Sequence, residues 1–360
     1  MSIRCLGHAI MVWVALLVTV AGCQTPRATG MIHTNRPFTL EPNGRVEMGQ
    51  SVSIGEVPQY LDISGRADTQ PVLLYLHGGP GRSAIPSSHV YAESLERHYV
   101  VAHWDQRGTQ RSYTEALEDF PLSAERLVND TVELSRLLAS WFERERVVLV
   151  AEGVAALPAL RAAQRHPEAF YAVVLLAPII DMQAALAHSY RWTLGQAHDR
   201  RHVEALMALQ SLGKPPWSGE RETAALMTLL YWMDRWGGTV PGVDAIERLA
   251  ELEAGANAGR RARQERARQG QAYSLERLWP ALREMSLARH TPSIQAPVFF
   301  IVGEADQRAP LAHVEAYYEA LDARQGKTLV KLKGVGHWPL LEAPEQVIEV
   351  LAGRVWPMAQ

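Results

Sequence analysis

The sequence predicts an α/β fold with a mostly parallel sheet, flanked by helices and interrupted by one long helical insertion. The first observation is the alternation of short apolar runs with amphipathic helical stretches between residues 50 and 180. The second is that helical patterning alone fills residues 181–287, after which apolar strand patterns return. The chain has 360 residues, 47% of them hydrophobic, so it can bury a core of this size.

The N-terminal segment, residues 1–22, has the pattern of a signal peptide. It carries one charged side chain, Arg4, and a short apolar run that ends in small residues before Cys23. It resembles a bacterial lipoprotein signal, which implies that Cys23 is lipidated and tethers the protein to a membrane. Because Gln24 and not aspartate follows, the resemblance implies the cell envelope, at the periplasmic face of the outer membrane. An ordinary N-terminal anchor helix is the alternative.

Residues 23–49 are expected to form a tether, because proline and glycine recur through them. The only cysteines are Cys5 and Cys23, so no disulfide is expected in the mature chain. Formal net charge is −3, and removing Arg4 with the signal takes it from −3 to −4. This near-neutral balance gives no indication of a nucleic-acid partner.

The first half of the fold is expected to contain six strands. Strands are predicted at 51–54, 58–63, 71–76, 99–104, 147–151 and 173–176. Helices are predicted around 88–97, after Ser123 as an N-cap, and at about 154–165. Two further strands, 297–302 and 328–332, bring the sheet to eight.

The helical insertion at 181–287 is expected to form a cap, leaving 50–180 and 288–360 as the core domain. Within it, the arginine-rich run from Arg260 to Arg268 has two interpretations, a patch for an anionic surface or a solvated helix face. The solvated face is favoured. No internal repeat is present.

Five motifs at the ends of predicted strands carry a family resemblance: HGGPG at 77–81, DQRG at 105–108, AEGVA at 151–155, GEAD at 303–306 and GVGHW at 334–338. In order and spacing the chain resembles the α/β-hydrolases, and specifically their proline iminopeptidase-like branch. The resemblance implies an eight-stranded sheet with a helical cap, serine aminopeptidase-type acyl transfer, and neither a cofactor nor a metal.

The same resemblance implies roles for individual residues. His337 corresponds to the general base and Asp306 to the triad acid, with Glu304 as the competing candidate. The amides of Gly79 and Val154 correspond to the oxyanion hole. His77, Gly78, Asp105 and Arg107 correspond to residues that shape the pocket, Asp105 and Arg107 more by structure than by chemistry. For the glycines of the HGGPG loop, Gly81 included, a plain tight turn is the alternative.

The strand–turn–helix at 151–155 departs from the family pattern G-x-S-x-G, because Gly153 stands where the nucleophilic serine is expected. Glycine tolerates the positive φ of this turn, so its shape should persist. Glu152 is expected to point away from the catalytic side. Ser83 and Ser112 are the serines nearest to the pocket along the chain, and neither is expected to replace the lost nucleophile.

Four hypotheses follow. The first is a degenerate hydrolase that binds a peptide or acyl ligand. The second is an active aminopeptidase or esterase that uses a His337-activated water or another nucleophile. The third is a His–Asp dyad enzyme of the lyase or oxygenase type, by fold analogy alone, and the fourth is a purely structural domain. Glu220, Glu222 and Asp234 are candidates for binding the amine of a peptide, while the ligand and the oligomeric state are not indicated.

Overall fold

The computed structural model of the protein describes residues 36–359, except 68, 115–116, 118–121, 220 and 254–259. The predicted signal segment, Cys23, residues 24–35 of the predicted tether and Glu220 therefore lie outside the described residues. Within the described part, no helix is both long enough and apolar enough to cross a membrane.

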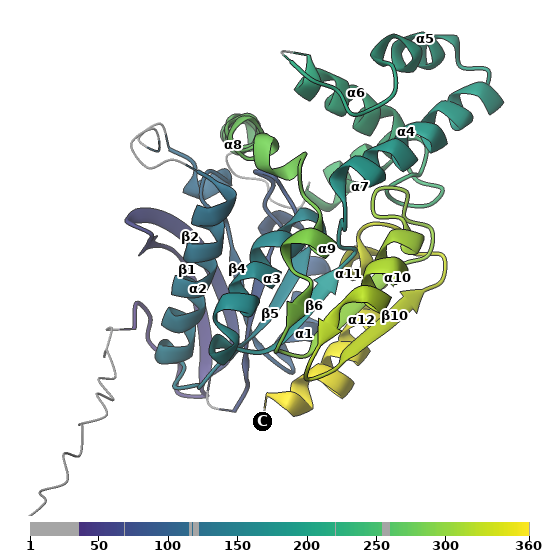
Figure 1. Ribbon diagram of the computed structural model, residues 1–360. Coiled ribbons are helices and arrows are strands. Elements are labelled where there is room, and N and C mark those ends of the chain that lie inside the picture. The colour runs from purple at the N-terminus through teal and green to yellow at the C-terminus, as the bar shows by residue number, and fades with distance from the viewer. Residues whose placement is uncertain are drawn as a thin grey trace, which may run out of the picture. The chain divides into compact units, whose positions relative to one another are not determined.

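Eight strands form one sheet (Figure 1). Their order is β1 (Arg45–Ile54), β2 (Val57–Arg66), β4 (Val100–Trp104), β3 (Val72–Leu76), β5 (Val147–Glu152), β6 (Phe170–Leu176), β8 (Val298–Gly303) and β10 (Lys327–Leu332). Strand β2 is antiparallel to β1 and β4, and all other neighbours are parallel. The predicted mostly parallel, eight-stranded sheet is confirmed.

The N-terminal boundary of the sheet differs from the prediction. Strand β1 begins at Arg45 and not at Ser51, and it pairs with β2 from Arg45↔Arg66 to Ile54↔Val57. Residues 45–49, predicted to lie in the tether, therefore belong to the sheet. Only Val46 and Met48 are buried in this stretch. An edge strand with one face exposed to solvent has few apolar residues, so its hydrophobic pattern predicts a strand only weakly.

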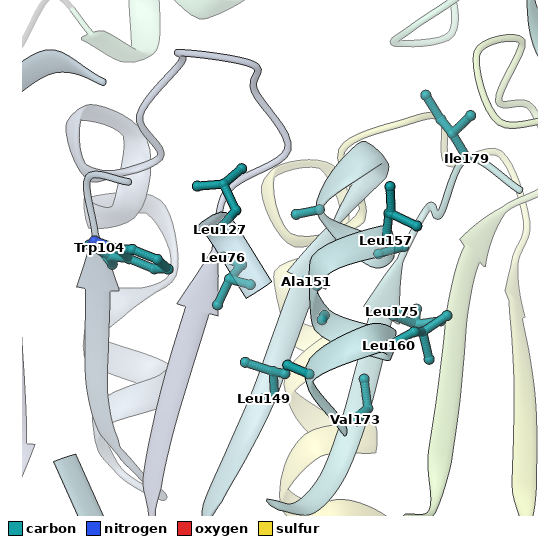
Figure 2. Close-up of a cluster of buried hydrophobic side chains, with 14 of the residues drawn as sticks. Leu76, Trp104, Leu127, Leu149, Ala151, Leu157, Leu160, Val173, Leu175 and Ile179 are labelled. Carbon is teal, nitrogen blue, oxygen red and sulfur yellow. The ribbon is translucent and has the colours of Figure 1, made fainter. Parts of the chain in front are cut away.

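Side chains along the central strands alternate between two cores, as the pleat of a strand requires. Leu74 and Leu76 of β3 face the core that holds α2 (Ala124–Trp141) and α3 (Ala156–Arg165). Leu73 and Tyr75 face the core on the other side of the sheet. Figure 2 shows Leu157 and Leu160 of α3 lying against Leu175 of β6 in the first core.

Helix boundaries follow local signals. The N-cap prediction is confirmed, because Ser123 Oγ accepts a hydrogen bond from the Arg126 amide at 3.1 Å. The helix predicted over 88–97 is divided into η1 (Ile85–Val90) and α1 (Ala92–Glu96), because Tyr91 has φ −130 and leaves helical geometry. The pairing of β7 (Ser293–Ile294) with β9 (Asp322–Ala323) was not predicted, because a strand of two residues is too short to show an alternating hydrophobic pattern.

The segment between β6 and β8 is helical, and Figure 1 shows α4 to α7 together beyond one end of the sheet. Its helices are α4 (Met182–Asp199), α5 (Val203–Leu212), α6 (Glu222–Arg235), α7 (Ala245–Glu253) and α8 (Arg260–Leu282). In the basic run, Arg266 and Arg268 are exposed.

The remaining elements complete the core domain. They are η2 (Gln110–Ser112), η4 (Gly153–Ala155), η5 (Pro167–Ala169), α9 (Leu287–His290), α10 (Leu311–Ala320), α11 (Pro339–Glu342), α12 (Pro344–Val350), η6 (Leu351–Val355) and η7 (Trp356–Met358).

Candidate active site

His337 and Asp306 form a buried pair at the carboxyl ends of β8 and β10. His337 Nδ1 lies 2.7 Å from Asp306 Oδ2, and both side chains are almost fully enclosed. The other Asp306 oxygen accepts hydrogen bonds from the amides of Arg308 and Ala309 at 2.7 and 2.9 Å. Asp306 is thus held to orient the imidazole, whereas the competing Glu304 is exposed.

Gly153 sits at the apex of the turn between β5 and α3, with φ +56. A Cβ added there would lie 3.4 Å from His337 Nε2 and 3.9 Å from the Gly78 Cα. A hydroxymethyl group at this position would therefore project toward the second ring nitrogen of the histidine. The turn keeps the strand–turn–helix shape of an elbow, and Gly153 brings no side chain to its apex.

The HGGPG loop faces this turn, as predicted. Gly78, Gly79 and Val154 border the same cavity as Gly153 and His337. The Gly79 amide makes no backbone hydrogen bond in the described part of the chain, and Val154 lies in the first turn of η4, where a backbone N–H has no partner within its own helix. Both donors can therefore serve a negatively charged oxygen.

His77 anchors the loop and is neutral. The Gln106 amide donates to His77 Nε2 at 3.3 Å, and the Gln106 side chain donates to the His77 carbonyl at 3.0 Å. Burial lowers the pKa of His77 to about 3, with a smaller contribution from His103. His77 thus takes part in positioning the loop and not in proton transfer at neutral pH.

Gly81 allows the cap to touch this loop. A Cβ at Gly81 would lie 2.6 Å from both the Gln271 Cα and the Gly270 carbonyl oxygen of α8, a contact that no side chain could keep. Ser274 Oγ of the same helix donates to the Gly108 carbonyl at 3.2 Å. Glycine is required here because two backbones approach each other closely, and not only because the loop makes a tight turn.

Asp105 and Arg107 lie beneath the loops and do not border the cavity that holds His337. Arg107 Nε donates to Asp130 Oδ2 at 2.9 Å, and its Nη2 donates to Asp130 Oδ1 at 3.1 Å and to the Gly55 carbonyl at 2.8 Å. The pair ties the DQRG loop to α2 and to the β1–β2 turn. Its role is structural, as the sequence favoured.

Asp105 should make stability depend on pH. Burial raises the pKa of this carboxyl to about 6, against hydrogen bonds from Ser83 and the Arg111 amide that lower it. The folded state therefore holds the proton more tightly than the unfolded state, whose pKa is about 4. The ionised carboxyl destabilises the fold fully above pH ~6, and this cost disappears as the pH falls toward ~4.

Asp105→Asn is neutral at every pH, so we expect it to raise Tm at pH 7.5 by about 2–5 °C and to have little effect at pH 4. Thermal unfolding at both pH values measures this difference, with Glu304→Gln, on the exposed surface, as the control. An equal effect of Asp105→Asn at the two pH values would contradict the assignment.

Glu152 does not point away from the site, so that prediction is wrong. Its side chain borders the cavity, and its Oε2 accepts a hydrogen bond from the Tyr75 hydroxyl at 2.5 Å. Burial raises the pKa of Tyr75 well above its ordinary value, and Glu152 raises it further, so the hydroxyl remains a donor. The tyrosine holds the carboxylate beside the elbow.

Neither candidate serine replaces the nucleophile in this geometry. Ser112 Oγ is buried away from the cavity, donating to the Asp105 carbonyl at 2.5 Å and accepting from the Tyr60 amide at 2.7 Å. Ser83 borders the cavity, and its hydroxyl accepts a hydrogen bond from the Ile85 amide at 3.1 Å. In the described part of the chain it makes no hydrogen bond to His337.

Two positioning groups were missed from the sequence. Glu342 accepts hydrogen bonds from the amides of Gly336 and Trp338 at 2.8 and 2.9 Å, on either side of His337. The Thr239 carbonyl accepts from the His337 amide at 2.7 Å, and the Thr239 hydroxyl bonds to Asp234. Apart from the short separation between Gly336 and Glu342, the spacing of residues along the sequence predicts neither contact.

The cavity above these groups has a volume of about 460 Å³ and is walled by the cap. Of the candidate acidic cap residues, Asp234 borders it, whereas Glu222 forms an ion pair with Arg283 at 3.0 Å and does not. Glu253, which the sequence did not single out, also borders the cavity. No cluster of potential metal ligands occurs among the residues that the structure describes.

Known proteins are similar to this chain in sequence and in fold. A family model described as the alpha/beta hydrolase family matches residues 73–350. The probable aminopeptidase YbaC of Bacillus subtilis (strain 168) is 25% identical over 307 residues, covering 84% of this chain and 94% of that protein.

Solved structures agree at the level of the fold. The proline iminopeptidase-related protein of Thermus thermophilus has a TM-score of 0.59 at 22% identity, covering 87% of this chain and 98% of its own. The proline iminopeptidase of Mycobacterium smegmatis has a TM-score of 0.58 at 18% identity, covering 87% and 99%. With its elbow, its His–Asp pair and its helical cap, the chain belongs to the alpha/beta hydrolase family, and its fold is similar to that of proline iminopeptidases.

Proposed function

We propose that this protein is a degenerate hydrolase, which binds a peptide or acyl ligand in its cavity without forming an acyl-enzyme. The observation that carries the proposal is Gly153, whose missing side chain would have pointed at His337 Nε2 from 3.4 Å. Covalent acyl transfer needs a nucleophile at this position, and the nearby Ser83 hydroxyl makes no hydrogen bond to His337 in the described part of the chain. The cavity and the Gly79 and Val154 amides that border it support retained binding of a carbonyl compound.

The proposal is tested on the wild-type protein with a fluorophosphonate probe and with a binding assay. We expect no labelling, because no activated serine hydroxyl faces His337 in the described part of the chain, while short peptides or acyl compounds raise Tm by binding the folded state. The dipeptide prolyl-leucine and N-decanoyl-leucine serve as the binding probes. Stoichiometric labelling of any serine would overturn the proposal.

A second candidate is hydrolysis by a water molecule that His337 activates. It is favoured by the intact His337–Asp306 pair at 2.7 Å and by the space beside Gly153. Enzymes that lack triad members retain roughly 10³–10⁴-fold acceleration over water. Turnover of proline p-nitroanilide and a short ester, measured beside His337→Ala, tests this candidate. Equal rates for wild type and variant would exclude it.

We also propose that the protein is anchored in the bacterial cell envelope by lipidation of Cys23. The support is the sequence pattern before that cysteine. Incorporation of a labelled fatty acid that Cys23→Ala abolishes is the expected result. Labelling that persists in the variant would contradict the anchor.

A further inference from the structure

Arg82 places a positive charge at the cavity. It follows the HGGPG loop directly and borders the cavity together with Gly153 and His337. Its guanidinium carbon lies 5.8 Å from the centroid of the Trp338 ring. Within the described part of the chain, its side chain makes no ion pair and no hydrogen bond. Arg82 is exposed to solvent.

The charges around Arg82 do not neutralise it by contact. Burial lowers the pKa of its guanidinium, and Arg308 lowers it further, while Glu253, Asp234 and Glu152 act in the opposite direction from a longer range. Two of these carboxylates already have partners, since Asp234 accepts from Thr239 and Glu152 from Tyr75. A guanidinium without a partner at the border of a cavity is available to donate charge-assisted hydrogen bonds to an anionic ligand.

The surroundings favour one negative charge on the ligand. A guanidinium presents a fork that matches a carboxylate in two parallel hydrogen bonds. The three nearby carboxylates would repel a doubly charged phosphate more strongly than a singly charged carboxylate. The rest of the cavity is lined by apolar side chains of the cap, Leu186, Leu226, Leu249 and Trp279. The remainder of the ligand is therefore expected to be apolar.

We propose that Arg82 binds a carboxylate of the ligand, so that the cavity selects carboxylate-bearing peptides or acyl amino acids over their neutral amides. The inference rests on the proposed function, because it assigns the chemistry of the ligand in that same cavity. Arg82 contacts the ligand and not the reacting atoms, so its role is specificity.

The test is calorimetric binding of two matched pairs of probes to the full-length protein. Prolyl-leucine is compared with prolyl-leucine amide, and N-decanoyl-leucine with N-decanoyl-leucine amide. For each probe that binds, we expect the carboxylate form to bind about 10- to 100-fold more tightly than the amide, the range of hydrogen bonds to a charged group. Which pair binds more tightly separates a peptide ligand from an acyl amino acid.

Variants isolate the guanidinium. Arg82→Gln should reduce the affinity for the carboxylate by about 10-fold or more and leave the amide nearly unchanged. Arg268→Gln, which removes a positive charge from the cavity border at an exposed position, is the matched control and should have little effect.

The outcomes separate this inference from the proposed function. If the amides bind as tightly as the carboxylates, or if Arg82→Gln weakens both equally, Arg82 only packs on Trp338 and the inference is overturned while ligand binding stands. If none of the four probes binds the wild type, both the inference and the proposed function are overturned. Circular dichroism and Tm of Arg82→Gln show whether the variant is folded.

Discussion

Replacing Gly153 with serine is expected to give a protein that a fluorophosphonate probe labels to near stoichiometry. The position is open, since the nearest atoms to a new Cβ are His337 Nε2 at 3.4 Å and the Gly78 Cα at 3.9 Å. The new hydroxyl would meet an imidazole that Asp306 already holds at 2.7 Å, and the amides of Gly79 and Val154 would face the developing oxyanion. One substitution would then complete the catalytic geometry.

The same substitution should cost stability. Gly153 has φ +56, a conformation in which a residue with a Cβ is disfavoured by about 1–2 kcal/mol. Gly153→Ala carries the same backbone strain without the hydroxyl, so it is the matched control for Tm. The serine and alanine variants should lose similar stability, and only the serine variant should react.

Kinetics give the second readout. If the rest of the site is intact, Gly153→Ser should hydrolyse a short ester at least ~10³-fold faster than the wild type, and adding His337→Ala should remove this gain. A folded Gly153→Ser protein that neither labels nor turns over substrate would show that the loss extends beyond one residue. That result would support the degenerate-hydrolase proposal, and it would contradict the claim that the rest of the site is intact.

The strand-end motifs made much of this geometry predictable. In a parallel sheet the carboxyl ends of all strands meet at one edge, so motifs that follow β3, β5, β8 and β10 must converge. This is why His337 and Asp306, 31 residues apart, could be placed together from the sequence. The positive φ of Gly153 followed from the same logic, because an apolar strand that turns directly into a buried helix needs a sharp reversal.

The contents of the cavity were less predictable, because they depend on where long side chains point. Glu152 was expected to face away, yet the Tyr75 hydroxyl holds it at the cavity. Asp105 and Arg107 were expected to shape the pocket more by structure than by chemistry, and Arg107 turns inward to Asp130 on α2. A hydrogen-bond partner elsewhere in the chain decides each case, and spacing along the sequence does not encode it. Arg82 and Glu253 were missed for the same reason.

Asp130→Ala is expected to destabilise the fold by about 3–5 kcal/mol, the second large effect. Arg107 and Asp130 side chains are 0% and 1% exposed and bond at 2.9 Å, so removing the carboxylate leaves a guanidinium buried without its counter-charge. Asp130 Oδ2 also accepts from Gln59 at 2.9 Å, and that donor would lose its acceptor too. Free energy of unfolding from urea titration measures the loss.

A surface pair provides the control, and the contrast tests the physical argument. Arg136 and Glu168 bond at 3.1 Å with side chains 57% and 60% exposed, so Glu168→Ala should cost no more than about 1 kcal/mol. If Asp130→Ala cost no more than this, the buried pair would not hold the DQRG loop.

Loss of the buried pair should also affect the site, because Gln106, next to Arg107, binds His77 and through it the loop that carries the Gly79 amide. In a Gly153→Ser background, a milder Asp130→Asn change should therefore lower kcat for ester hydrolysis more than Glu168→Ala does, since the oxyanion donors lose their support.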